Sequence, residues 1–291
     1  MRGQILTMLA VGMASISLVW SAPASAGNEA KAAEHVKVTE HVKAAEHVKA
    51  AEHVKVTEHV KVTEHVKVTE HVKAAEHLKA AEHLIELVRI GRGIVLEQMD
   101  NINDPTKADK GFTGDYIAGQ VLERFMKATT LDLRIHNVVP KANLYLALVQ
   151  AEKEVVDEAQ PVINKAGIAF KGFSPDVFAR RTGEYFYKKS GVRLKLTGID
   201  YRNPSNKPDA FEAEVLRMFR GPRHPKGQAY VRNTMEDGRP VLRMMDPEYV
   251  SLSCLGCHGT PKSERDVTGM KKEGWEEGNL AGAISVVLPL K

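Results

Sequence analysis

The sequence is poor in cysteine and in aromatic residues. Cys254 and Cys257 are the only two cysteines in 291 residues, so a zinc site with two cysteine pairs is excluded. Aromatic residues make up 6% of the chain, and apart from Trp20 they all lie beyond residue 110. The hydrophobic core must therefore form in the C-terminal two-thirds of the chain, where about 200 residues are enough for one sizeable core.

A strong charge excess and long apolar segments are also missing. The formal net charge is only +4, and no basic patch is interleaved with aromatic residues, so nothing here favours nucleic-acid binding. No run of 18 apolar residues occurs after the N-terminal segment, so we expect no stable membrane span in the mature protein.

The N-terminus has the pattern of a secretory signal peptide. Arg2 precedes an apolar run at residues 5–20, and Ala24-Ser25-Ala26 is a small-residue cleavage site. A membrane anchor is the alternative, but the run is short and interrupted by polar residues. We expect cleavage after Ala26 and a soluble periplasmic protein, whose net charge falls from +4 to +3 because Arg2 is lost.

A hexapeptide repeat, EHVKAA or EHVKVT, occupies residues 34–79. Nine Glu-His pairs occur from Glu34-His35 to Glu82-His83, and they contain nine of the twelve histidines. On a helix, a step of six residues turns about 600°, so the histidines fall on three faces and do not converge on one ion. A disordered tract and a loose metal- or haem-binding tract are alternatives. Helix propensity and Glu-Lys pairs favour a helical spacer that could self-associate.

Three parts of the chain are therefore expected: a signal peptide at 1–26, the repeat spacer at 27–83 and a globular domain at 84–291. Helical periodicity predicts helices first and antiparallel strands later, which is an α+β arrangement with a long N-terminal helix. The expected helices are 84–104, 115–130, 142–167, 175–191 and 209–221, and the expected strands are 192–199, 228–235, 241–245 and 280–290.

The two cysteines belong to the motif Cys254-Leu-Gly-Cys257-His258. A zinc site would need two more ligands, and no closely spaced histidine pair is available to supply them. A thioredoxin-like dithiol needs a strand before and a helix after the motif, whereas glycine and proline follow here. In C-x-x-C-H the thiols add to the two haem vinyl groups and the histidine becomes the proximal iron ligand. Because c-type haem is attached after export, motif and signal peptide together favour one covalent haem.

The globular part resembles a bacterial family of PAS-like c-type haem domains, found alone in the periplasm or as sensor regions of histidine kinases and chemoreceptors. The residues that carry the resemblance are DKGFTGDYIAGQVLERF at 109–125, INKAGIAFKGFSPDVFARR at 163–181, YRNPSNKPDAFE at 201–212 and CLGCHGTPKSERDVTGMKKEGWEEGNLAGAISVVL at 254–288. The resemblance implies a PAS-like antiparallel sheet with packed helices and with the haem held against it.

The resemblance also implies roles for single residues. Cys254 and Cys257 become the thioether links and His258 the proximal ligand. Arg180 and Arg181 are candidates for the haem propionates, with a solvated helix face as the alternative. The loop residues Arg202, Asn203, Pro204, Asn206, Pro208 and Asp209 match the family motif, and we expect turn-forming roles for them.

The sixth iron ligand is left open by the sequence. A cysteine thiolate is excluded because there is no third cysteine. Met244 and Met245, on an expected strand shortly before the motif, and His136 are the candidates. The alternative role of each methionine is core packing.

The expected function is periplasmic redox chemistry, as an electron carrier or a redox sensor, through a separate periplasmic redox or signalling protein. A gas sensor acting through such a partner is the alternative from another class. A peroxidase-type enzyme is a weaker one, because no distal histidine-arginine pair can be identified. We therefore expect a haem-binding carrier or sensor rather than an enzyme.

Overall fold

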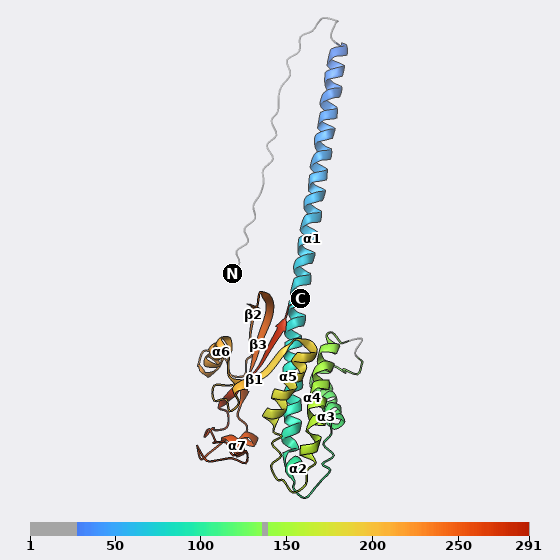
Figure 1. Cartoon of the computed structure of the whole chain (residues 1–291). Coiled ribbons are helices and arrows are strands. Elements are labelled where there is room, and N and C mark those ends of the chain that lie inside the picture. The colour runs from blue at the N-terminus through green and yellow to red at the C-terminus, as the bar shows by residue number, and fades with distance from the viewer. Residues whose placement is uncertain (1–27, 136–138, 291) are drawn as a thin grey trace, which may run out of the picture. The chain divides into compact units, whose positions relative to one another are not determined.

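The computed structural model describes residues 28–135 and 139–290, and the side chains from residue 43 onward except 44–45 and 56–71. The expected signal peptide and the candidate ligand His136 therefore lie outside the described residues. The elements are α1 (Asn28–Glu97), α2 (Met99–Asn103), α3 (Gly114–Thr129), α4 (Ala142–Ile163), α5 (Pro175–Ser190), β1 (Arg193–Thr197), η1 (Pro204–Asn206), α6 (Ala210–Arg220), β2 (Tyr230–Glu236), β3 (Arg239–Tyr249), η2 (Leu252–Cys254), α7 (Leu255–His258) and β4 (Leu280–Pro289). The expected α+β class is confirmed, with helices first and strands later (Figure 1).

The long N-terminal helix is also confirmed, because α1 runs without a break from the repeat into residues 84–97. The chain divides into two units, at residues 1–67 and 68–291. Within the first unit, the described side chains of residues 46–55 are exposed. This helix ends at Glu97, and a separate short helix, α2, covers part of the expected 84–104 segment.

The last copies of the repeat contribute to the core of the second unit. Ala80 and Ala81 are fully buried, and His77 is only 8% exposed. The Nδ1 atom of His83 lies 3.2 Å from the Tyr145 hydroxyl, and its ring meets the edge of Phe125. His77 and His83, which the sequence assigned to the spacer, thus pack into the folded unit.

The four strands form one antiparallel sheet in the order β1-β4-β3-β2, so the first strand pairs with the last. Side chains alternate between its faces. Leu242 and Met244 on β3 join the main core with Ile284 and Val286 on β4. Met245 points to the opposite face and joins a second cluster with Val215 and Phe219 of α6. Both faces of the central strands are therefore covered.

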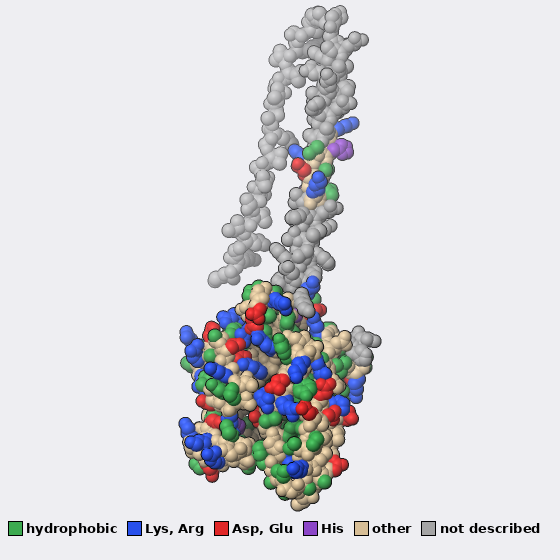
Figure 2. Space-filling model, viewed as in Figure 1, with side chains coloured by type: hydrophobic (Ala, Val, Ile, Leu, Met, Phe, Trp, Pro, Cys, Tyr) green, Lys and Arg blue, Asp and Glu red, His purple; other side chains and the backbone are tan. Residues whose placement is uncertain are grey.

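The sheet lies between two helical layers. The second unit's part of α1 packs with α3, α4 and α5 against one face, and α6 packs against the other (Figure 1). On the face shown in Figure 2, basic and acidic side chains of this unit are interspersed. Among the described residues, no helix is long and apolar enough to cross a membrane.

The N-terminus of α6 fixes the loop that precedes it. Asp209 accepts a hydrogen bond from the Glu212 amide, and the Glu212 carboxylate accepts one from the Asp209 amide, which forms a capping box. Arg243 on β3 donates to Asp209 over 2.6 Å, and Lys195 on β1 pairs with buried Glu212 over 2.9 Å. The loop at 201–209 is thus tied to two strands of the sheet.

Two deletions test which copies of the repeat belong to the folded core and which act only as a spacer. Removal of residues 30–66 should leave the free energy of unfolding of the second unit unchanged, because it removes none of that unit's residues. Removal of residues 30–83 also takes away the buried Ala80 and Ala81 and uncovers Tyr145. It should cost about 2–5 kcal/mol or prevent folding. Denaturant unfolding of both variants checks this, and equal stabilities would contradict the placement of the last copies in the core.

Candidate functional site

The Cys-x-x-Cys-His segment folds as two short helical turns, η2 and α7, directly after β3. Both cysteines are free and partly exposed, and Cys254 Sγ lies 3.4 Å from the Ser251 hydroxyl. One turn of helix brings Cys254 and Cys257 to neighbouring positions, with His258 next to the second cysteine. The segment therefore presents two thiols and an imidazole from one small piece of backbone.

The segment at residues 273–275 contacts His258 through both its backbone and its side chains. The amides of Gly274 and Trp275 both donate to the His258 carbonyl, over 3.0 and 2.9 Å. Gly274 has φ +78°, and a Cβ there would lie 2.8 Å from the Lys262 Cβ. Glycine is required at this turn, which places Glu273 and Trp275 beside the imidazole.

The His258 ring has one nitrogen engaged. Its Nδ1 lies 2.6 Å from Glu273 Oε2, and its face stacks on Trp275 with 4.6 Å between ring centroids. An ionised carboxylate only accepts hydrogen bonds, so Nδ1 carries the proton in this contact. The neutral ring then keeps its free lone pair on Nε2, which is the atom left to bind a metal.

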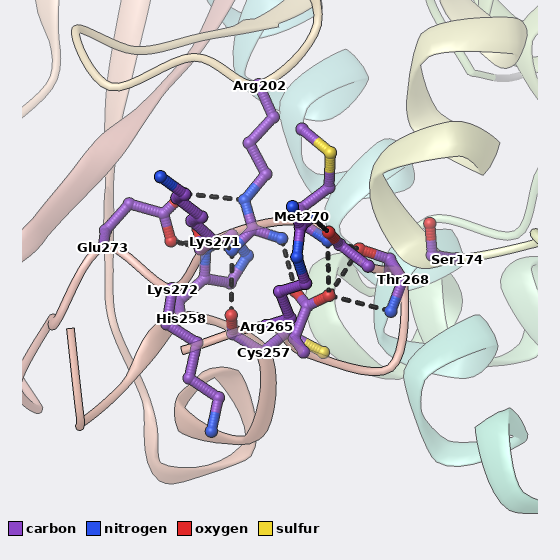
Figure 3. Close-up of polar contacts among 12 residues, drawn as sticks. Ser174, Arg202, Cys257, His258, Arg265, Thr268, Met270, Lys271, Lys272 and Glu273 are labelled. Atoms are coloured by element: carbon purple, nitrogen blue, oxygen red, sulfur yellow. Dashed lines mark hydrogen bonds and ion pairs between the residues drawn. The ribbon is translucent and has the colours of Figure 1, made fainter. Parts of the chain in front are cut away.

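Arg202 holds Glu273 in place. Its Nε and Nη2 donate to the two Glu273 oxygens over 2.6 and 2.8 Å, and its Nη1 donates to Asp266 over 2.6 Å. Nη2 also donates to the carbonyls of Cys257 and Lys271, over 2.8 and 3.2 Å. Figure 3 shows Arg202 reaching from its loop toward Glu273, His258 and Cys257. One side chain thus joins the 201–209 loop to the motif and to both carboxylates.

Both carboxylates are held in the ionised form. Burial alone would raise the pKa of Asp266, but hydrogen bonds from Thr268 and Arg202 outweigh it and lower that pKa to about 2. Burial also acts to raise the pKa of Glu273, and the contacts with Arg202 and His258 bring it below the ordinary value. The imidazole therefore faces a fixed negative charge.

The Cys257 thiol differs from the reactive thiol of a redox dithiol. Burial raises the pKa of Cys257, and the nearby Asp266 charge raises it further, against the opposing effect of Arg202. Reactive cysteines of thiol-disulfide enzymes have a lowered pKa instead. Among the described residues, no group of three or more His, Cys, Asp or Glu side chains could hold a metal ion.

A cavity of about 440 Å³ opens beside His258 and Trp275. Its wall is mixed, with apolar Phe170, Val177 and Leu196 on one part and charged Arg92, Asp176 and Glu248 on another. Cofactor pockets have volumes of roughly 300–1,000 Å³ and a mostly apolar lining with a few polar groups. The volume of this cavity lies within that range, and His258 is one of its lining residues.

One cation of the cavity wall has a free donor. The Nη1 of Arg92 donates to Glu248 over 2.7 Å, while its Nε is buried without a hydrogen-bond partner in the structure. The Arg202 donors are instead taken up by Glu273, Asp266 and backbone carbonyls. Arg92 is thus the lining arginine with a donor that the described protein groups leave unused.

The remaining candidate residues lie elsewhere. Met244 and Met245 are buried on opposite faces of β3, and neither lines the cavity beside His258. Arg180 pairs with Glu184 over 2.9 Å and Arg181 with Glu158 over 2.5 Å, and neither lines the cavity. The expected turn-forming roles are found at Asn203, which caps η1, and at Asp209, which caps α6.

The sequence did not single out five residues of the site: Arg92, Asp266, Met270, Glu273 and Trp275. Asp266 to Trp275 all fall within the 254–288 block that carries the family resemblance, which is the one signal that could have directed attention to them. Arg202 was noted, but for a turn-forming role. Its bonds to Glu273 and Asp266 cross 71 and 64 residues of sequence, and residue spacing does not predict such contacts.

The comparisons with known proteins match one family. Residues 91–289 fit the family model described as Tll0287-like, Tll0287. The match covers the motif, the Arg202 loop and the whole sheet. Searches of the curated proteins and of the solved structures found no match.

Replacement of Gly274 tests the turn that frames His258. Gly274→Ala should lower the free energy of unfolding by more than about 1 kcal/mol, because the new Cβ meets Lys262 and φ is positive. Gly119→Ala is the matched control on α3, where nothing lies within 4 Å of the new Cβ, and it should stabilise by about 0.5–1 kcal/mol. Denaturant unfolding measures both, and equal effects would contradict the proposed constraint.

Acid should weaken the Arg202 network in a defined range of pH. The folded-state pKa of Asp266, about 2, is below its ordinary value of 3.8, so its contribution is present above about pH 4 and lost as the pH falls toward 2. Asp266→Asn removes this titration. Between pH 5 and 2 the wild type should therefore lose more unfolding free energy than the variant, and parallel pH curves would refute this role.

Proposed function

The chain belongs to the Tll0287-like family, and from this membership and the geometry at His258 we propose that it is an exported protein carrying one covalent c-type haem. We propose that it acts in periplasmic redox chemistry, as an electron carrier or a redox sensor, with a separate redox or signalling protein as its partner. The haem would supply a one-electron couple, and the protein would supply its attachment, its orientation and its electrostatic surroundings.

One observation carries this proposal: the carboxylate contact to His258 Nδ1. A histidine that binds a metal through one nitrogen almost always donates a hydrogen bond from the other, often to a carboxylate. Here Glu273 occupies Nδ1 at 2.6 Å, and the free Nε2 belongs to a histidine that directly follows two free cysteines. This arrangement is typical of a histidine that binds a metal through Nε2.

The surrounding residues fit the group. Cys254 and Cys257 would form the thioether bonds, and the raised pKa of Cys257 keeps its thiol protonated until it is attached. The apolar part of the cavity wall, formed by Phe170, Val177 and Leu196, would pack against the macrocycle. Arg92 would bind a propionate with its guanidinium, and we favour it over Arg180 and Arg181 because it lines the cavity and they do not.

The PAS-like comparison is part of the same proposal. Its support is the antiparallel sheet whose first and last strands are neighbours, with helices on both faces. Leu196 and Ala283, from these two strands, line the cavity. A haem bound there would lie against the end of the sheet.

Gas sensing is the second candidate, and the composition of the cavity wall favours it. Among the described residues that line the cavity, His258 is the one histidine and Met270 the one methionine, and no cysteine is present. Met270 is largely exposed. A sixth position without a strong protein ligand would be open to a small gas.

The first experiment is the visible absorption spectrum of the exported protein, oxidised and reduced, with and without carbon monoxide. We expect a covalent haem spectrum that disappears in a Cys254→Ala, Cys257→Ala double variant. A wild type without covalent haem would overturn the proposal. Sharp low-spin bands that carbon monoxide leaves unchanged would support electron transfer or redox sensing, and a shifted spectrum would support gas sensing.

A second pair of variants locates the sixth ligand. If Met270 supplies it, Met270→Leu should make the reduced spectrum sensitive to carbon monoxide, while Met244→Leu, a swap of similar volume in the core, should leave it unchanged. The reverse result would return the role to the β3 strand. No change in either variant would exclude both methionines.

A further inference from the structure

The Arg202–Glu273–His258 chain of contacts goes beyond what attachment of a haem requires. Attachment needs the two cysteines, and ligation needs the His258 Nε2. Yet Glu273 lies 2.6 Å from the opposite nitrogen, and Arg202 binds both oxygens of that carboxylate. The orientation of the His258 ring is therefore fixed by Glu273, and the position of Glu273 is in turn fixed by Arg202.

The position of Glu273 is unusually constrained for a carboxylate near the surface. It is 14% exposed, and the neighbouring Gly274 and Trp275 amides are bound to the His258 carbonyl. Arg202 in turn holds the Cys257 carbonyl over 2.8 Å. A movement of Glu273 away from the ring would break bonds to the same segment that carries the ligand.

The charge of this group is negative. Arg202 contributes one positive charge, while Glu273 and Asp266 contribute two negative charges. A negative charge near the iron stabilises its oxidised form, which carries one more positive charge than the reduced form. A strong hydrogen bond from Nδ1 to a carboxylate acts in the same direction, because it makes the imidazole a more basic ligand.

We infer that Glu273, fixed by Arg202, is a positioning residue that makes His258 an electron-rich ligand and lowers the reduction potential of the bound haem. This inference rests on the proposed function. Reduction adds one electron from a one-electron donor protein, and no bond forms or breaks at His258. The Nδ1 proton remains in the contact with Glu273 throughout.

Glu273→Gln tests the inference, because the amide oxygen can still accept the Nδ1 hydrogen bond while the charge is lost. In a redox titration of the haem-loaded protein with mediators, we expect the equilibrium constant for reduction to rise at least tenfold. This corresponds to about 59 mV for one electron.

Asp266→Asn is the matched control. It removes the same charge from another partner of Arg202, and no contact joins Asp266 to the His258 ring in the structure. Because the contact between Glu273 and the His258 Nδ1 is kept, we expect a rise in the equilibrium constant smaller than that of Glu273→Gln. Equal shifts in the two variants, or an unchanged potential in Glu273→Gln, would overturn the inference while leaving the proposed function in place.

Two further measurements cover a variant that does not fold or take up haem. Glu273→Asp keeps the charge on a shorter side chain and should give a shift smaller than that of Glu273→Gln. In the reduced wild type, the Nδ1 proton of His258 should exchange slowly with solvent in an NMR experiment, and fast exchange would overturn the inference. A wild type without covalent haem would overturn the proposed function, and this inference with it.

Discussion

Arg202 is the side chain on which the geometry of the site depends. Its guanidinium spans Glu273, Asp266 and the Cys257 carbonyl, and these groups come from three points of an otherwise irregular segment. That segment, between η2 and β4, has little regular structure of its own. Five donors in a rigid plane can fix several acceptors at once, which a lysine ammonium in the same place could not do. The orientation of His258 follows from this, because the carboxylate that binds its ring is set by the arginine.

The scaffold explains how Arg202 reaches this place. Its loop leads into α6, whose capping box is bonded to Arg243 on β3 and to Lys195 on β1. Both strands are neighbours of β4, which follows the segment of the site. The sheet therefore fixes the arginine loop from one side and the end of the motif segment from the other. The helices that precede the sheet build the opposite wall of the cavity, through α1 and α5.

The sequence predicted those helices and strands that local residue patterns determine. Periodicity predicted α5 and β1 to within a few residues, and it predicted the hairpin of β2 and β3, although β3 continues to Tyr249. The motif spacing and the signal peptide together indicated a haem at Cys254, Cys257 and His258, which stays a prediction. Spacing could not predict the partners of His258, because Arg202 lies 56 positions before it and the turn that brings Glu273 back depends on Gly274. Alternation placed Met244 and Met245 on opposite faces of a strand, and only the tertiary structure shows that both faces are covered by helices.

The charges of Arg202, Asp266 and Glu273 do not balance within the protein. Asp266 is fully buried at its side chain and Glu273 nearly so, and they share one arginine. An uncompensated buried charge costs several kcal/mol, so a net charge of −1 here is unfavourable without a further cation. The iron-porphyrin core of an oxidised haem, counted without its propionates, would contribute +1 beside His258 and offset this charge. A reduced haem would contribute none. In the proposed haem protein, the network that orients His258 would therefore also favour the oxidised form of the haem.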